Sequence, residues 1–99
     1  MPKKRLIIDK KDLVANYLSG KSYVTVDLLN EDIATVAVEP CKVGLFKNRQ
    51  GERIVITRCV PSEPIIYYRH VEKKFFDSYL EELEKFCNDN RIKFHRKTE

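Results

Sequence analysis

The last third of the chain carries the pattern that most constrains its fold. Between Val71 and Asn90, apolar residues recur at three- and four-residue spacing, which predicts one amphipathic helix. Directly after this helix, the segment from Arg91 to Lys97 alternates basic with apolar residues, as a strand with one face in a core does. The end of the chain is therefore expected to be a helix followed at once by a strand.

The predicted strand has two different faces. Ile92 and Phe94 are expected to enter the core, because successive side chains of a strand point to opposite sides. The opposite face carries an outward basic row: Arg91, Lys93, His95 and Lys97. This row is the best candidate for a functional surface, and nothing in the sequence identifies a ligand or a reaction.

Length and composition indicate a folded protein. The 99 residues are 42% hydrophobic and 34% charged, which suits one core and a single domain over residues 1–99. No segment approaches the roughly 20 apolar residues that span a bilayer, and the first residues lack the apolar stretch of a signal peptide. We therefore expect a soluble cytoplasmic protein without a membrane partner.

The cysteines are odd in number and widely spaced, in apolar surroundings: Cys41, Cys59 and Cys87. This arrangement favours reduced core thiols over a disulfide framework.

Charge is unevenly distributed along the chain. The net charge of +4 divides into +3 for residues 1–30, +1 for 31–60, −3 for 61–90 and +3 for 91–99. Both ends are basic and the long helix is acidic, so one face could attract a polyanion. A charged surface that only maintains solubility explains the same numbers.

Turn-forming residues divide the rest of the chain into short elements. Leu6–Ile8 is a predicted strand, and Asp9 and Gly20 bracket a predicted helix. The apolar face of that helix would carry Leu13, Val14, Tyr17 and Leu18. Two hairpins should follow, 22–29 with 33–38 and, after an interruption at Pro40, 42–47 with 53–60. Residues 65–68 are assigned to a strand, with the first turn of the long helix as the alternative.

The resulting order, β-α-β-β-hairpin-α-β, is related to a ferredoxin-like unit. It predicts an α+β fold built as a two-layer sandwich, in which two helices cover a mainly antiparallel sheet. In that topology the last strand lies antiparallel beside the first. Two basic clusters would then form one patch, with Lys3, Lys4 and Arg5 beside His95, Arg96 and Lys97.

The long helix has a wide aromatic stripe on its apolar face, formed by Phe75, Phe76, Tyr79, Leu80, Leu83, Phe86 and Cys87. Packing on its own sheet is the first interpretation. A contribution to a homodimer contact is the alternative, because exposed aromatic surface is typical of interfaces.

Catalytic and metal-binding patterns are weak. His70 and His95 have no Cys or carboxylate at the spacing of a zinc site, and no serine lies in a Gly-x-Ser-x-Gly turn. The segments 9–11 and 72–74 match the loose acidic-x-Lys ending of metal-dependent nucleases, a match that arises by chance in a Lys- and Glu-rich chain. We expect no enzyme activity, no metal and no cofactor.

The composition of the whole chain resembles the small orphan proteins of viruses that infect hyperthermophilic archaea. It is rich in Lys, Glu and Ile, Met1 is its only methionine and Gln50 its only glutamine. This resemblance implies an accessory factor that acts on nucleic acid or blocks a host protein, and it carries no functional residues across.

The sequence thus favours a non-enzymatic binding protein. The leading hypothesis is a nucleic-acid or nucleoprotein contact, since cations bind phosphates with release of counterions. The predicted contact residues are Lys3, Lys4, Arg5, Arg91, Lys93, His95, Arg96 and Lys97. The alternative is a homodimeric protein-interaction factor that recognises a host or viral polypeptide.

Overall fold

The computed structural model describes residues 4–43 and 49–97. Within this part of the chain there are strands, two α-helices and one 3-10 turn: β1 (Leu6–Ile8), β2 (Asp12–Ser19), β3 (Ser22–Leu29), η1 (Asn30–Asp32), β4 (Ile33–Val43), β5 (Arg49–Arg58), β6 (Ile65–Tyr68), α1 (Arg69–Glu72), α2 (Phe75–Asn90) and β7 (Lys93–Arg96). The predicted α+β class is confirmed.

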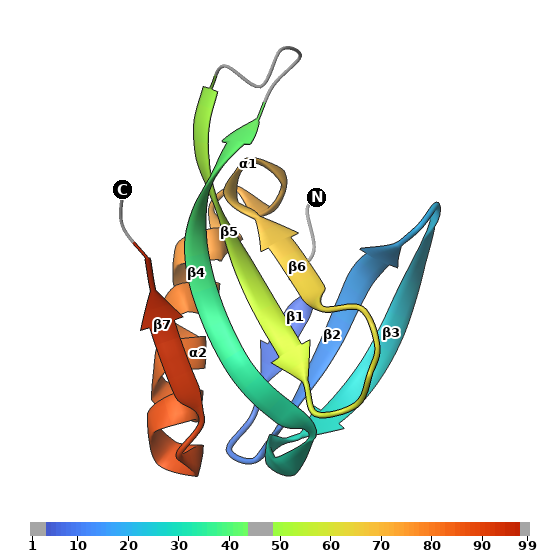
Figure 1. The fold of residues 1–99 in the computed structure, drawn as a ribbon, viewed down its shortest axis with the longest axis vertical. Helices are drawn as coiled ribbons and strands as arrows, with labels where there is room; N and C mark the ends of the chain where they lie inside the picture. The colour runs from blue at the N-terminus through green and yellow to red at the C-terminus, as the bar shows by residue number, and fades with distance from the viewer. Residues whose placement is uncertain (1–3, 44–48, 98–99) are drawn as a thin grey trace.

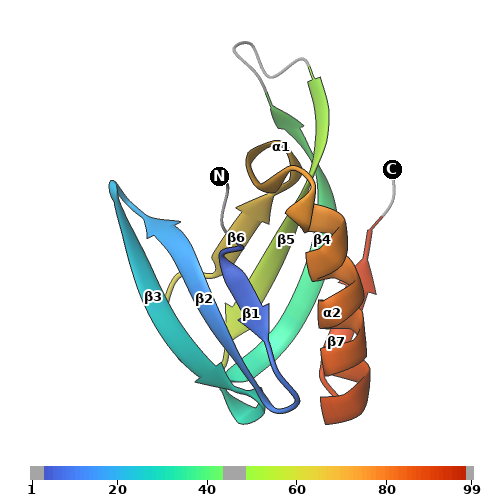
Figure 2. The ribbon, with the colours of Figure 1, turned by 180° about the vertical axis from the view of Figure 1, so that it is seen from behind.

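The strands form two sheets that face each other in a sandwich-like arrangement (Figure 1). One sheet is the antiparallel meander β1-β2-β3, and the other has the order β6-β5-β4-β7. Only the β4–β7 pair is parallel among the described strands. Helix α2 lies along one side of the sandwich, where it contacts both β1 and β7 (Figure 2).

The core lies between the two sheets and α2. Alternate residues of β2, namely Leu13, Ala15 and Tyr17, are buried, as expected for a strand with one face inward. The second sheet contributes Val36, Val38, Ile54, Ile56, Ile65 and Tyr67. The helix contributes its aromatic stripe, with Phe76, Tyr79, Leu80, Leu83, Phe86 and Cys87 buried. The stripe therefore packs within its own chain, as the first interpretation held.

The predicted helix between Asp9 and Gly20 is wrong, because this segment forms β2. Its apolar residues fit a helical spacing, but Leu13, Ala15 and Tyr17 also fit the two-residue period of a strand. Pairing with β1 and with β3 along the full length of β2 favours the strand. Gly20, at a φ of 63°, belongs to a tight hairpin turn rather than a helix end.

The predicted pairing of residues 22–29 with 33–38 is also wrong. β3 pairs with β2, and η1 then carries the chain across to the second sheet. The second predicted hairpin is real but longer, since β4 continues through Pro40, which lies opposite Glu52 on β5. Its predicted turn residues fall partly in 44–48, outside the described residues.

The carboxy-terminal elements follow the prediction more closely. Residues 65–68 form strand β6, and the long helix ends at Asn90 as expected. Its predicted start at Val71 is wrong, because Lys73 adopts a positive φ of 55° and separates α1 from α2, which begins at Phe75. Arg91 adopts the left-handed conformation (φ 58°), and the N–H of Ile92 donates to the carbonyl of Cys87 at 2.8 Å. This is the hydrogen bond that closes many helix ends.

The position of the last strand corrects the ferredoxin-like topology. β7 lies parallel to β4 at the edge of the four-stranded sheet, and not antiparallel beside β1. The first of the two predicted covering helices is the strand β2. The predicted β-α-β-β order is therefore wrong. The two ends of the described chain therefore belong to different sheets.

The three cysteines are free thiols. Cys87 is buried, and burial raises the pKa of its thiol to about 11. Cys41 is half-buried, and Cys59 is exposed, so the prediction of a core position is wrong for Cys59. No helix in the described residues has the length and apolar character needed to cross a membrane.

Candidate binding groove between the two sheets

The structure does not form the single basic patch predicted from the two ends of the chain. Arg5 leads into β1 in the three-stranded sheet, whereas Lys93, His95 and Arg96 lie on β7 in the other sheet. Lys3 lies outside the described residues. The prediction of one joined surface is therefore wrong, because the two strands that would bring the clusters together are not neighbours.

The amino-terminal cations are paired with carboxylates of the helical segment. The Nζ of Lys4 lies 2.7 Å from Oε2 of Glu82 on α2. Arg5 lies 3.5 Å from Glu72, whose side chain is only 5% exposed. These two cations tie the start of the first sheet to α1 and α2.

The carboxy-terminal cations divide into paired and unpaired residues. Arg96 lies 3.6 Å from Glu52, and Lys97 lies 3.4 Å from Glu39. Arg91, Lys93 and His95 are exposed, and no carboxylate of the described residues forms an ion pair with them. Ile92 and Phe94 pack against the core as predicted.

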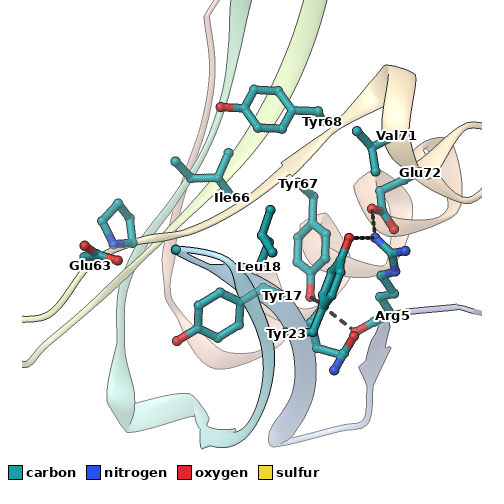
Figure 3. Close-up of a pocket in the computed structure, with 13 residues that line it drawn as sticks. Arg5, Tyr17, Leu18, Tyr23, Glu63, Ile66, Tyr67, Tyr68, Val71 and Glu72 are labelled. Carbon is teal, nitrogen blue, oxygen red and sulfur yellow. Dashed lines mark hydrogen bonds and ion pairs between the residues drawn. The ribbon is translucent and has the colours of Figure 1, made fainter.

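A groove of about 420 Å³ opens between the β2–β3 hairpin and the β6–α1 segment (Figure 3). This volume lies in the usual range of ligand sites. Four tyrosines from three strands line it: Tyr17, Tyr23, Tyr67 and Tyr68. Glu63 lies toward one end of the groove, and the pair of Arg5 and Glu72 lies toward the other.

Buried and partly buried hydrogen bonds fix the floor of the groove. The Tyr67 hydroxyl lies 3.2 Å from the carbonyl oxygen of Arg5 and 3.1 Å from that of Asn16, so it binds the first sheet to β6. The Tyr79 hydroxyl accepts the N–H of Arg5 at 2.8 Å and donates to Glu72 at 3.2 Å. Burial raises the pKa of both hydroxyl groups, so both stay protonated at neutral pH.

One wall of the groove is a cation stacked on an aromatic ring. The guanidinium of Arg5 lies 4.6 Å from the ring centroid of Tyr23, and its Nη1 donates to the Tyr23 hydroxyl at 3.0 Å. The same guanidinium reaches Glu72, so a residue predicted to contact phosphates instead holds the hairpin against α1. Both long side chains lose freedom in this contact, which makes the wall preformed.

The rim of the groove is apolar and faces solvent. Leu18 is 55% exposed, Tyr23 50% and Val71 45%. Scattered exposed apolar residues are ordinary on protein surfaces, but several around one concavity mark an interaction site. Elsewhere, Ile7 and Val60 are equally exposed but do not line the groove.

A tight turn places two of these rim residues. The β2–β3 ladder closes at Ser19 opposite Ser22, which leaves Gly20 and Lys21 as the two turn residues. The first of them has a positive φ of 63°, which glycine tolerates best. Leu18 and Tyr23 are direct partners one step before the turn, so both project from the hairpin tip.

Sequence reasoning missed this groove because it assigned β2 to a helix. The useful signal was Leu18 and Tyr23, two large apolar residues spaced symmetrically about the turn Gly20–Lys21. In a hairpin they become neighbours on a solvent-facing tip, where two large apolar side chains are unusual.

Apart from the exposed Glu63, the charged groups of the groove are held in internal contacts. Glu72 is held by Arg5 and Tyr79, and Tyr67 is held by backbone carbonyls. Across residues 4–43 and 49–97, no cluster of three or more His, Cys, Asp or Glu side chains is arranged to hold a metal ion. The groove therefore offers apolar surface and backbone edges rather than free reactive groups.

Comparisons with known proteins found no relative: no family model, no curated protein and no solved structure matches the chain.

Proposed function

We propose that the protein is a non-enzymatic binding protein that holds a segment of another polypeptide in this groove. The observation that carries the proposal is the solvent-exposed apolar rim of Leu18, Tyr23 and Val71 above a rigid tyrosine floor. Aromatic residues supply large contact area at low entropy cost, and they are enriched in protein interfaces.

The free edge of β6 supports a polypeptide as the occupant. Among the described strands β6 pairs only with β5, so no strand bonds to the backbone along its other edge, although β2 packs nearby. Ile66 and Tyr68 point to one face of β6 and Tyr67 to the other, and all three line the groove. The groove therefore follows that edge. An extended peptide could bond to the backbone there as an added strand and place alternate side chains against the tyrosines.

The charge in the groove indicates what kind of peptide fits. Arg5 and Glu72 neutralise each other, which leaves the exposed Glu63 as the remaining lining charge. A segment with apolar or aromatic residues and one cation near Glu63 complements this distribution.

A random-peptide phage library, selected on the immobilised protein, tests the proposal. Peptides that bind the parent should bind Leu18→Lys/Val71→Lys at least about tenfold more weakly, because both substitutions put a charge on an apolar contact. The matched control is Ile7→Lys/Val60→Lys, which makes the same change at residues that are 60% and 58% exposed outside the groove.

Two results would count against the proposal. One is a library that yields no peptide enriched over an unrelated immobilised protein. The other is a set of binders that lose affinity equally in the groove variant and in the control variant.

Nucleic-acid binding is the second candidate, and one observation favours it. Arg91, Lys93 and His95 are exposed without ion pairs in the described part of the chain, so their charge is available to phosphates. The supporting result would be mobility-shift titrations with single- and double-stranded DNA and RNA in which affinity falls steeply with salt. On either proposal, we further propose the viral origin expected from composition and the cytoplasmic location expected from the lack of long apolar segments in the sequence.

A further inference from the structure

Strand β3 has one partner and one open edge. It pairs with β2 from Ser22 to Leu29, and no described strand lies on its other side. Figure 2 shows β3 as the outer strand of its sheet. An open edge presents unpaired N–H and C=O groups along the whole strand, which is a template for another strand.

The other edge strands are shorter than β3, and β7 is also strongly charged. β1 has three residues, β7 carries Lys93, His95 and Arg96, and β6 has four residues beside the groove. β3 has eight residues, a register without a bulge, no proline, and Asp27 as its only charge. Native proteins usually block long edges with lysine, proline or a bulge. The lack of these devices on β3 indicates that its edge is covered.

The direction of the backbone groups on β3 can be assigned. The N–H of Asn30, which follows β3, donates to the carbonyl of Lys11 at 2.8 Å, on the β2 side. Because bonding alternates along an antiparallel strand, the even-numbered residues of β3 bond to β2. The residues with outward backbone groups are therefore Tyr23, Thr25, Asp27 and Leu29. The outward N–H of Leu29 is already occupied, because it donates to Oδ2 of Asp32 at 3.0 Å.

We infer that the partner of β3 is a second copy of this chain. The two β3 strands pair antiparallel about a two-fold axis at Val26, which creates a continuous six-stranded sheet. In this register Tyr23 lies opposite Leu29 of the partner subunit, Thr25 opposite Asp27 of the partner subunit, and Val24 opposite Leu28 of the partner subunit. The inference does not depend on the proposed function of the groove.

Self-complementarity is the argument for a second copy. Tyr23 and Leu29 are each 50% exposed and Val24 is 37% exposed, and this register covers them with apolar partners. It also keeps Asp27 away from its own copy, so no like charges meet. The outward backbone groups of Thr25 and Asp27 bond to each other, and the Tyr23–Leu29 pair keeps one of its two bonds because of Asp32.

Of the groove rim, only Tyr23 lies on the strand that pairs, so Leu18 and Val71 stay outside the subunit contact. Tyr23 rims the groove near one end of β3, and antiparallel pairing places the equivalent residue of the partner subunit near the other end. Two grooves on one particle would allow two segments of one partner to bind together, which increases avidity.

Sedimentation equilibrium of the full chain tests the inference. The parent should sediment as a dimer, and Thr25→Pro should weaken dimerisation at least about tenfold, because proline removes an outward N–H without removing a bond to β2. Thr25→Val keeps that N–H and is the matched control, and it should remain dimeric. Far-ultraviolet circular dichroism establishes that each variant is folded.

A disulfide trap tests the register. In a Cys41→Ser/Cys59→Ser background, Val26→Cys should form a cross-linked dimer on mild oxidation, since opposed residues in a non-bonded pair have Cα atoms about 4.5 Å apart. Thr25→Cys, which would face Asp27 of the partner subunit, should cross-link much less. A parent that is a monomer at high concentration would overturn the inference. So would a dimer that tolerates Thr25→Pro and gives no cross-link through Val26→Cys.

Discussion

The cations at the two ends of the chain look alike in sequence but have different positions in the fold. Near the amino end, Arg5 stacks on Tyr23 and pairs with Glu72, a carboxylate that is almost fully buried. Near the carboxyl end, Lys93 and His95 lie exposed at a sheet edge. The first group is part of a wall and the second remains in solvent.

This difference shows that the carboxylates brought close by folding determine what a basic residue does. Arg5 has lost most of its freedom to bind a phosphate, because Glu72 would then be left buried without a partner. Arg91, Lys93 and His95 keep that freedom, because no carboxylate of the described residues pairs with them. A basic segment in a sequence therefore predicts a binding surface only where the fold leaves its charges unpaired.

The largest expected effect comes from breaking the amino-terminal contact. Arg5→Met should lower the free energy of unfolding by about 2 kcal/mol, less than a fully buried pair because Arg5 is itself 35% exposed. Lys97→Met, which removes an exposed cation from Glu39, should cost under about 1 kcal/mol. Urea unfolding of both variants measures the difference. Equal losses of unfolding free energy would mean that the ion pairs at the two ends of the chain contribute equally to stability.

Acid unfolding tests the contribution of Glu39, the carboxylate that pairs with Lys97 near the carboxyl end and with Arg53. Partial burial raises the pKa of the Glu39 carboxyl, but hydrogen bonds from Arg53 and Lys97 outweigh it and hold that pKa below its ordinary value. Protons therefore bind the unfolded chain first, so this contribution is complete above the ordinary pKa and is lost as the pH falls through the folded value.

Glu39→Gln should consequently flatten the loss of stability between about pH 5 and pH 3, measured by urea midpoints across that range. Glu84→Gln, at an exposed position of α2 without an ion pair in the described part of the chain, is the control and should change the profile little. An unchanged acid profile in Glu39→Gln would show that the contacts to Arg53 and Lys97 contribute nothing.

The smallest effect on stability is expected from the exposed cations at and beside the edge strand β7. Arg91→Ser/Lys93→Ser/Lys97→Ser should change the free energy of unfolding by less than about 1 kcal/mol. If this edge binds nucleic acid, the same variant should reduce the slope of log affinity against log salt by about two to three. A variant that binds DNA and RNA as the parent does would remove the nucleic-acid candidate.

Local sequence patterns predicted an element correctly where the apolar residues fitted only one periodicity, either that of a helix or that of a strand. The helix that ends at Asn90 and the following segment that packs Ile92 and Phe94 against the core could both be predicted, because burial on one face follows from spacing alone. Residues 12–19 fitted a helix and a strand equally well, and only their pairing with β1 and β3 decided between them. That pairing depends on the neighbouring segments, and Gly20, which turns the chain between β2 and β3, fits a helix end as well as a hairpin turn.

The site was harder to predict because it depends on which strands meet. Arg5 and Glu72 are far apart in sequence, and their pairing requires β1 to start beside α1. Likewise, the groove exists only because the β2–β3 hairpin stands opposite β6. Tyr17 and Tyr67 come from different sheets, and no spacing rule connects them.

The central claim is that the groove, and not the basic edge, is the principal binding surface. Amide chemical-shift mapping of the ¹⁵N-labelled protein, titrated with the tightest library peptide, tests it most directly. The expected result is saturable shifts at Leu18, Tyr67 and Val71, with the amides of Lys93 and His95 unchanged. Shifts centred on β7 with an unperturbed groove would contradict the account.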